Sequence, residues 1–182
     1  AIHAKVPDLS IHVSTQANNL NSYTCRFWKN MGATRVNLAR ELTFEEIKNI
    51  AFNVGRDIEL EVFVHGAMCM SYSGRCMLSD YMTGRSSNRG DCAQPCRWEY
   101  IQSNGTCDAI YVEENNTTGG TYLFNSKDLC LLPYLPELVK SGVHSLKIEG
   151  RMKSEFYVAL VVRAYRKLLD MIEGGENITP DI

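Results

Sequence analysis

The sequence lacks a long hydrophobic run, a signal peptide and an excess of basic charge. No apolar stretch in the 182 residues approaches the roughly 18 residues of a membrane span, so we expect no membrane association. The first residues, AIHAKVPDLSIHVST, show no basic segment followed by an apolar core, and they lack an initiator methionine, so we expect an internal fragment. The formal net charge of −2 provides no overall basic field for DNA or anionic lipid, and RNA binding would need a local patch.

Three motifs of hydrolytic enzymes are also missing. The chain has no GxSxG nucleophile elbow, no HExxH zinc motif and no Cys–His–Asn spacing of a thiol peptidase. A thiol peptidase needs one activated cysteine beside a base, and the sequence singles out no such pair. The residues by themselves therefore give no support to a peptidase.

The composition is that of a folded protein in a reducing compartment. Hydrophobic residues make up 45% and charged residues 22% of the chain, which is typical of one globular domain. The seven cysteines are an odd number, and no secretory signal accompanies them, so we expect a cytoplasmic protein. In that compartment, clustered cysteines bind metal or carry out redox chemistry more often than they form structural disulfides.

Strand and helix patterns alternate through most of the chain. Strand starts near residues 11, 35 and 59 recur with a step of about 24 residues, which is typical of parallel α/β proteins. Thr43 and Glu46 form a capping box at the start of one helix, and Gly55 follows its end. The expected strands are 9–19, 34–40, 58–66 and 143–150; the expected helices are 21–32, 43–55, 135–142 and 153–175; a hairpin is expected between 109–114 and 121–126.

The fold class that these elements predict is α/β, with a partial TIM-type barrel of parallel strands and a cysteine-rich irregular insertion. Four strand–helix units are half of an eight-stranded barrel, and a small doubly wound sheet is the alternative. In one domain, we expect three strand–helix units at 1–66, the insertion at 67–120, and the last strand with a long helix at 121–182. Both architectures bind ligands beyond the C-terminal ends of the strands, so the insertion should lie over that mouth.

Four cysteines lie within 28 residues, and a fifth follows 34 residues later. One interpretation is a structural zinc site, although only one pair has the spacing of a zinc knuckle. A second is an iron–sulfur cluster, whose ligand spacing varies widely between families. A third is inert thiols, which suits Cys25 and Cys107 but not cysteines with polar neighbours. The clustered residues are Cys69, Cys76, Cys92 and Cys96, and the later one is Cys130.

Charged and titratable residues gather at the expected strand ends. Strand alternation places Glu61 and His65 on one face, as catalytic candidates or as structural residues, and Arg40 is the expected partner of Glu61. Lys147, Glu149 and Arg151 alternate along the last strand.

These charges are expected to face the barrel lumen. A charged lumen is unusual and favours an anionic ligand held by Arg40, Lys147 and Arg151, with Glu149 as a further catalytic candidate. The alternative is a network of ion pairs that fills the barrel.

A local cluster of arginines in the insertion, close to aromatic residues, suggests contact with RNA. Guanidinium groups pair with phosphates and aromatic rings stack on bases, while the alternative is an ordinary solvated surface. The residues concerned are Arg75, Arg85, Arg89, Arg97, Trp98 and Tyr100.

Four segments resemble conserved blocks of one known family. They are LARELTFEEI (38–47), EVFVHGAMCMSYSGRCMLSDYMTGRSSNRGDCAQPCRWEY (61–100), NSKDLCLLPYLPEL (125–138) and HSLKIEGRMKSEFYVALVVRAYRK (144–167). Together they are similar to the collagenase-like peptidases of family U32. The resemblance implies a TIM-type barrel core, and either peptidase activity or oxygen-independent hydroxylation of tRNA wobble uridine, ribosomal cytidine or ubiquinone precursors.

The resemblance also implies a cofactor and its ligands. Hydroxylating members carry a 4Fe–4S cluster, use prephenate as the implicated hydroxyl source, and in some instances work with a partner subunit of the same family. Cys69, Cys76 and Cys92 match cluster positions. The fourth ligand is either Cys130 or Cys96, and we favour Cys130 because SKDLC lies close to a strand end. We therefore expect a cluster-dependent enzyme acting on tRNA, the alternative being a collagenase-like peptidase with structural or zinc-bound cysteines.

Overall fold

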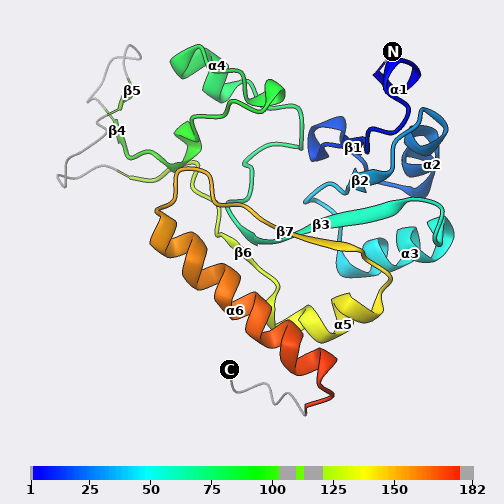
Figure 1. The fold of residues 1–182 in the computed structure, drawn as a ribbon. Coiled ribbons are helices and arrows are strands. Elements are labelled where there is room, and N and C mark those ends of the chain that lie inside the picture. Colours follow the sequence, from blue (N-terminus) through cyan, green and yellow to red (C-terminus); the bar gives the residue numbers. More distant parts are fainter. Residues whose placement is uncertain (1, 103–109, 113–120, 177–182) are drawn as a thin grey trace.

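The core of the protein is an open, largely parallel sheet (Figure 1). The computed structural model describes residues 2–102, 110–112 and 121–176. Four strands pair side by side in chain order and all in parallel; they are β1 (His12–Val13), β2 (Arg35–Asn37), β3 (Glu59–Gly66) and β7 (Ser145–Ile148). The α/β class and the sequential parallel pairing are confirmed. In the described part of the chain the sheet is open and does not close into a barrel.

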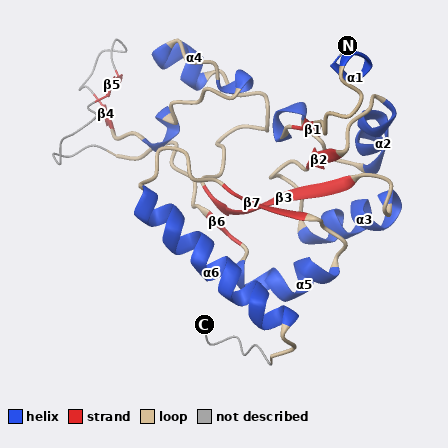
Figure 2. Ribbon diagram, viewed as in Figure 1, coloured by secondary structure: helices blue, strands red, loops and turns tan. Residues whose placement is uncertain are grey.

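Helices cover one face of this sheet (Figure 2). Apolar side chains of β2 and β3, such as Val36, Leu60 and Val64, are fully buried against the helices, because hydrophobic burial drives the two layers together. The longer helices are α2 (Ser22–Asn30), α3 (Phe44–Val54), α5 (Leu135–Lys140) and α6 (Glu155–Glu173).

The start of α3 shows how the sequence sets an element boundary. The Thr43 side chain accepts a hydrogen bond from the backbone N–H of Glu46, and the Glu46 carboxylate accepts one from the backbone N–H of Thr43. The helix ends at Gly55, whose φ of 61° lies in the left-handed region. The predicted capping box is therefore confirmed.

The middle of the chain differs from the prediction. A short strand, β6 (Leu129–Cys130), pairs antiparallel with the end of β3, so that Gly66 lies opposite Leu129. The expected hairpin is wrong, because β5 (Ile110–Val112) pairs with β4 (Tyr100–Gln102) and not with 121–126.

The insertion also contains short helices: α4 (Leu78–Thr83), η2 (Ser87–Arg89) and η3 (Pro95–Arg97). The remaining short elements are α1 (Ile2–Lys5), η1 (Thr15–Ala17) and η4 (Leu132–Tyr134).

No helix in the described ranges combines the length and the apolar character that crossing a membrane requires.

Tyr165 of α6 joins three elements through its buried hydroxyl. This hydroxyl donates to the carbonyl oxygen of Val64 in β3 at 2.6 Å and accepts from the backbone N–H of Leu131, just after β6, at 3.2 Å. We expect Tyr165→Phe to lower the free energy of unfolding by about 1–2 kcal/mol, because two hydrogen bonds of a buried hydroxyl are lost, while the N–H of Leu131 still donates to the carbonyl oxygen of Val64 at 2.9 Å. Urea denaturation followed by circular dichroism measures this loss.

Tyr157 provides the matched control for this prediction. It lies two turns earlier on α6, is only half-buried, and its hydroxyl bonds a side chain, His65, at 3.1 Å. Tyr157→Phe should lower the free energy of unfolding by less than about 1 kcal/mol. Equal losses in the two variants would contradict the structural role of Tyr165.

Candidate functional site

A cavity lies at the C-terminal ends of the four parallel strands. Its lining includes Thr15 after β1, Arg40 after β2, Ala67 after β3 and Glu149 after β7. This is the position at which α/β sheets bind ligands. The volume is about 100 Å³. The cysteine-rich insertion covers the opening, as expected from its departure at the end of β3.

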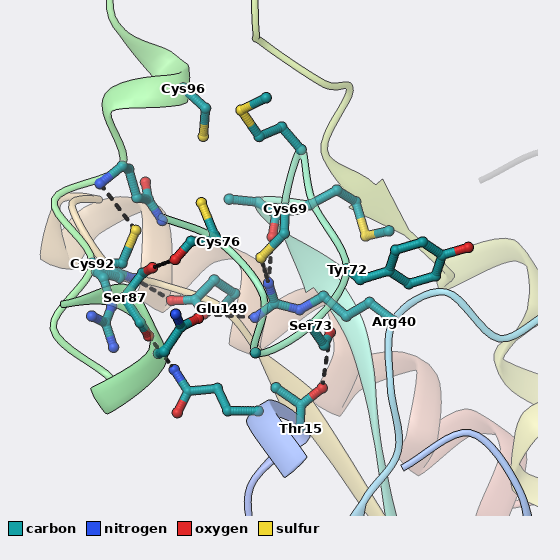
Figure 3. A pocket seen from close by; sticks show the side chains of 18 of the residues that line it. Thr15, Arg40, Cys69, Tyr72, Ser73, Cys76, Ser87, Cys92, Cys96 and Glu149 are labelled. Carbon is teal, nitrogen blue, oxygen red and sulfur yellow. Dashed lines mark hydrogen bonds and ion pairs between the residues drawn. The ribbon is translucent and has the colours of Figure 1, made fainter. Parts of the chain in front are cut away.

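Four thiols line this cavity, and they come from three parts of the insertion (Figure 3). Cys69 follows β3, Cys76 and Cys92 lie on either side of α4 and η2, and Cys96 is in η3. In Figure 3, the side chains of Cys76 and Cys96 point toward each other across the space. The structure therefore gathers side chains that are spread over a 28-residue stretch of the sequence.

Small polar side chains fix the path of the insertion around the cavity. The Glu41 carboxylate accepts from the backbone N–H of Ser73 at 2.5 Å. The Ser87 hydroxyl donates to the carbonyl oxygen of Cys76 at 2.7 Å, and Ser79 accepts from the backbone N–H of Ala93 at 3.0 Å. Because Ser79 and Ser87 are buried, these bonds replace regular secondary structure in holding the cysteines.

Gly74 brings the insertion against η1. A Cβ atom built on Gly74 would lie 2.0 Å from the carbonyl oxygen of Gln16, and the φ of Gly74 is 75°. Both facts require glycine here. Gln16 in turn donates from its side-chain amide to the carbonyl oxygen of Ser87 at 2.5 Å. Sequence analysis placed Gln16 only within the expected strand 9–19 and missed this contact.

Two of the sulfur atoms accept hydrogen bonds. The guanidinium of Arg40 donates to Sγ of Cys69 at 3.2 Å, and the backbone N–H of Gln94 donates to Sγ of Cys92 at 3.3 Å. Donors of this kind stabilise negative charge on sulfur and tune the potential of thiolate-bound clusters. Gln94, between two of the cysteines, is another contributor that sequence analysis missed.

Burial sets the protonation of two of these thiols. It raises the pKa of Cys69, an effect that the charge of Arg40 partly offsets, and it raises the pKa of Cys96. Protonated thiols are poor nucleophiles, whereas a bound metal would displace the proton. The environment of Cys69 and Cys96 therefore suits ligation better than covalent catalysis.

The thiols surround the cavity without converging on a single point. Within the described ranges, no group of three or more His, Cys, Asp or Glu side chains is placed to hold one metal ion. A zinc ion would need its ligand sulfurs within about 2.3 Å of one centre. A 4Fe–4S cluster takes four thiolates, and four thiols line this cavity.

The structure groups Cys96, and not Cys130, with the other three cysteines. Cys130 lies in β6, opposite His65 in the ladder and close to Tyr165, and it does not line the cavity. The choice between Cys96 and Cys130 as the fourth ligand stays a prediction, and the lining of this cavity favours Cys96. β6 runs antiparallel to β3 and places Cys130 beside Tyr165 of α6.

Cys25 takes no part in the cavity. Cys25 is fully buried inside α2, and burial raises its pKa to about 11, as suits an inert thiol. Cys107 lies outside the described residues.

A β-bulge separates the two catalytic candidates of β3. The pairing of β3 with β7 shifts register between Phe63 and His65, so the expected alternation from Glu61 to His65 fails. The ring of His65 turns to α6, where Nε2 lies 3.1 Å from the hydroxyl of Tyr157. Burial lowers the pKa of His65. His65 thus lies away from the thiol cavity.

Glu61 belongs to a network on the exposed face of the sheet. Its carboxylate pairs with Lys147 at 3.2 Å and with Arg35 at 3.7 Å, and it accepts from Ser145 at 2.8 Å. Burial acts to raise the pKa of Glu61, but the Ser145 hydrogen bond and the charge of Lys147 outweigh it and hold the pKa below its usual value. The expected pairing of Glu61 with Arg40 is wrong, because the pairing is with Lys147 and Arg35.

Arg40 instead connects the end of β7 to the thiol cavity. Its side chain is only 8% exposed, pairs with Glu149 at 2.9 Å, and lies 3.7 Å from the ring centroid of Phe63. Arg151 donates to the carbonyl oxygen of Gly90 at 2.5 Å. The structure therefore brings Arg40, Glu149 and Arg151 to the cavity, and it places Lys147 with Glu61 on the sheet face.

The arginines and aromatic residues of the insertion divide into two groups. Tyr100 is 2% exposed and donates to the carbonyl oxygen of Pro95, so its role is structural. Arg85 forms a surface ion pair with Asp91. Arg97 and Trp98 are half-buried and lie beside a second, polar cleft.

Comparison with known proteins supplies the family context. The model of peptidase family U32 matches residues 1–181. The chain is 48% identical to tRNA hydroxylation protein P1 of Bacillus subtilis over 90% of its own length and 38% of that protein. It is 41% identical to tRNA hydroxylation protein P of Escherichia coli over 93% of its own length and 46% of that protein. It is 33% identical to the collagenase of Porphyromonas gingivalis over 96% of its own length and 43% of that protein.

The chain thus spans less than half the length of these curated relatives. No solved structure matches it significantly.

Proposed function

Because the chain belongs to peptidase family U32, we propose that it is part of an iron–sulfur enzyme that hydroxylates tRNA, with wobble uridine as the target. The observation that carries the proposal is the gathering of four thiols in one cavity over the C-terminal strand ends. The relatives named for tRNA hydroxylation, at 41% and 48% identity, support the choice of substrate.

In this proposal, Cys69, Cys76, Cys92 and Cys96 hold a 4Fe–4S cluster. When bound, such a cluster supplies one-electron transfer at a potential that the protein tunes. The four thiols that line one cavity match the number of thiolates that such a cluster takes. The chain's own contribution is to place four thiols around one cavity.

Arg40 and Gln94 are the residues that would adjust the electron density on sulfur. Arg40 adds a positive charge next to Cys69, and its pairing with Glu149 fixes the direction of the guanidinium. The backbone N–H of Gln94 donates a hydrogen bond to the sulfur of Cys92 and adds no charge. Hydrogen bonds to ligand sulfur favour the more negative, reduced state of a cluster.

Hydroxylation replaces a C–H bond of the base by C–OH, so a co-substrate must supply the oxygen. The family resemblance makes prephenate the proposed source. A dicarboxylate needs cationic partners, and Arg40 and Arg151 already line the thiol cavity. In the described structure, both guanidinium groups bond protein acceptors, Glu149 and Gly90, which prephenate would compete with or displace.

A peptidase is the second candidate, because one relative is named a collagenase. One local feature favours it: Cys130 lies directly opposite His65 in the β3–β6 ladder. A thiol beside an imidazole is the minimal arrangement of a cysteine nucleophile. Against it, the His65 ring is already bonded to Tyr157.

The decisive experiment is anaerobic purification followed by two assays. Iron and acid-labile sulfide are measured with absorbance near 400 nm, and tRNA nucleosides from a deletion strain are profiled before and after complementation. We expect about four irons per chain, as in a 4Fe–4S centre, and loss of the hydroxylated uridine without the gene. A colourless protein with one zinc, or unchanged nucleosides with lost peptide cleavage, would refute the proposal.

A further inference from the structure

A second cleft opens beside the thiol cavity. It lies between the end of η3, the segment 125–128 and the turn that connects β7 to α6, and its volume is about 490 Å³. Such a volume is in the range of small-molecule sites and accommodates a nucleotide. Three residues, Ala67, Gln94 and Arg97, line both the cleft and the thiol cavity, so the two spaces are adjacent.

The cleft is locally basic in a chain whose net charge is −2. Three cations, Arg97, Lys127 and Lys153, line it, and Asp128 is the one carboxylate among the described lining residues. Asp128 pairs with Arg97 at 3.0 Å and with Lys153 at 3.3 Å. Lys127 makes no ion pair with any described residue, and it lines the cleft.

Arg97 also makes the cleft rigid. Its guanidinium donates to the carbonyl oxygen of Met68 at 3.2 Å and bonds Asn125 and the carbonyl oxygen of Ser126. The Ser126 hydroxyl donates to the same Met68 carbonyl at 2.8 Å. The segment that carries Lys127 is therefore fixed against the chain that follows β3.

The cleft also has an aromatic wall. Trp98 follows η3 and lines the cleft with its indole half-buried, so that part of the ring remains open. Aromatic side chains next to lysine and arginine are the usual platform for an unpaired base with its phosphate.

Two strained backbone positions border the same cleft. In the described chain, the left-handed region holds three residues other than glycine, and two of them, Gln94 with φ 56° and Met152 with φ 59°, line this space. Left-handed residues with a Cβ cost energy, and such strain concentrates at functional sites. Met152 immediately precedes Lys153, and both residues line the cleft.

We propose that this cleft holds one unpaired nucleotide of the RNA substrate, with its base against Trp98 and its phosphate at Lys127 and Lys153. The inference rests on the proposed function, which it deepens by locating the RNA. An unpaired nucleotide here would lie next to the thiol cavity, because Gln94 and Arg97 belong to both linings. A base-paired duplex would not fit, since its bases are stacked and closed to an indole.

The test is binding of a short fluorescein-labelled single-stranded RNA, measured by anisotropy on the purified protein at several salt concentrations. We expect Trp98→Ala to weaken binding about tenfold through lost stacking. Lys127→Ala should lower the slope of log K against log salt by roughly one, the effect of one lost phosphate contact. Matched controls elsewhere are Tyr23→Ala on α2, whose side chain is 77% exposed, and Lys167→Ala on α6.

The outcomes separate this inference from the proposed function. If Trp98→Ala and Lys127→Ala both leave the RNA affinity and its salt dependence unchanged, the proposal that this cleft binds a nucleotide is wrong, even in an enzyme that hydroxylates tRNA. Equal binding of the labelled duplex form would also overturn it. Conversely, RNA binding that depends on Trp98 and Lys127 in a protein without hydroxylation activity would support the cleft and contradict the proposed reaction. Circular dichroism confirms that each variant is folded.

Discussion

Cys96→Ser is expected to remove most of the iron from anaerobically purified protein, whereas Cys130→Ser should leave the iron content unchanged. Cys96 lines the thiol cavity, and Cys130 lies in β6 beside Tyr165, outside that lining. A serine hydroxyl is close to isosteric with the thiol but is a poor ligand for iron, so the substitution tests ligation rather than packing. Iron and sulfide analysis, with absorbance near 400 nm, measures the difference.

The two variants control for each other, because both replace one half-buried or exposed cysteine in the same chain. Cys69→Ser should behave as Cys96→Ser does, since Cys69 accepts the Arg40 hydrogen bond within the cavity. Cys25→Ser provides a stability control away from the site. Full iron in Cys96→Ser together with loss in Cys130→Ser would show that the fourth thiol comes from β6 and that the insertion rearranges around the cluster.

Gly74→Ala should be among the most destabilising single substitutions in the insertion. The added Cβ would lie 2.0 Å from the carbonyl oxygen of Gln16, and backbone on both sides leaves no flexible side chain to move away. Overpacking of this kind, added to left-handed strain, should cost more than about 3 kcal/mol of unfolding free energy. Because the insertion positions the thiols, the iron content should fall as well.

Gly84 gives a matched control in the same insertion. Its φ of 71° is close to the 75° of Gly74, but no atom lies within 4 Å of a Cβ built there. Gly84→Ala should therefore cost only the left-handed strain, about 1–2 kcal/mol. Urea denaturation of the two variants separates crowding from backbone strain. Equal losses would contradict the close approach of Gly74 to η1.

The regular part of the fold was predictable because its signals are local. The 24-residue step of strands and the Thr43 capping box depend on nearby residues, and each strand predicted for the parallel sheet is present. The position of the cavity was also predictable, since parallel strands share the direction of their C-terminal ends. A partial TIM-type barrel was also predicted, but the described strands form an open sheet.

The site itself depended on contacts that sequence spacing does not encode. The β-bulge after Phe63 turns His65 toward α6, and strict alternation gives no warning of it. Nothing in the sequence indicated that β6 runs antiparallel, which places Cys130 opposite His65 and outside the lining of the thiol cavity. Gln16 and Gln94 contribute through single hydrogen bonds, for which the sequence offers at most a weak signal such as the neighbouring Gly74.

The pairing of Gly66 with Leu129 has a consequence for how this protein tolerates change. Residues 67–128 leave the sheet and return to it at two positions that lie directly opposite each other in one ladder. The excursion is thus closed at its base, and the entropic cost of closing such a loop rises only slowly with its length. Insertions and deletions within it need not propagate into the sheet, so recognition elements can diversify there while the scaffold beneath stays the same.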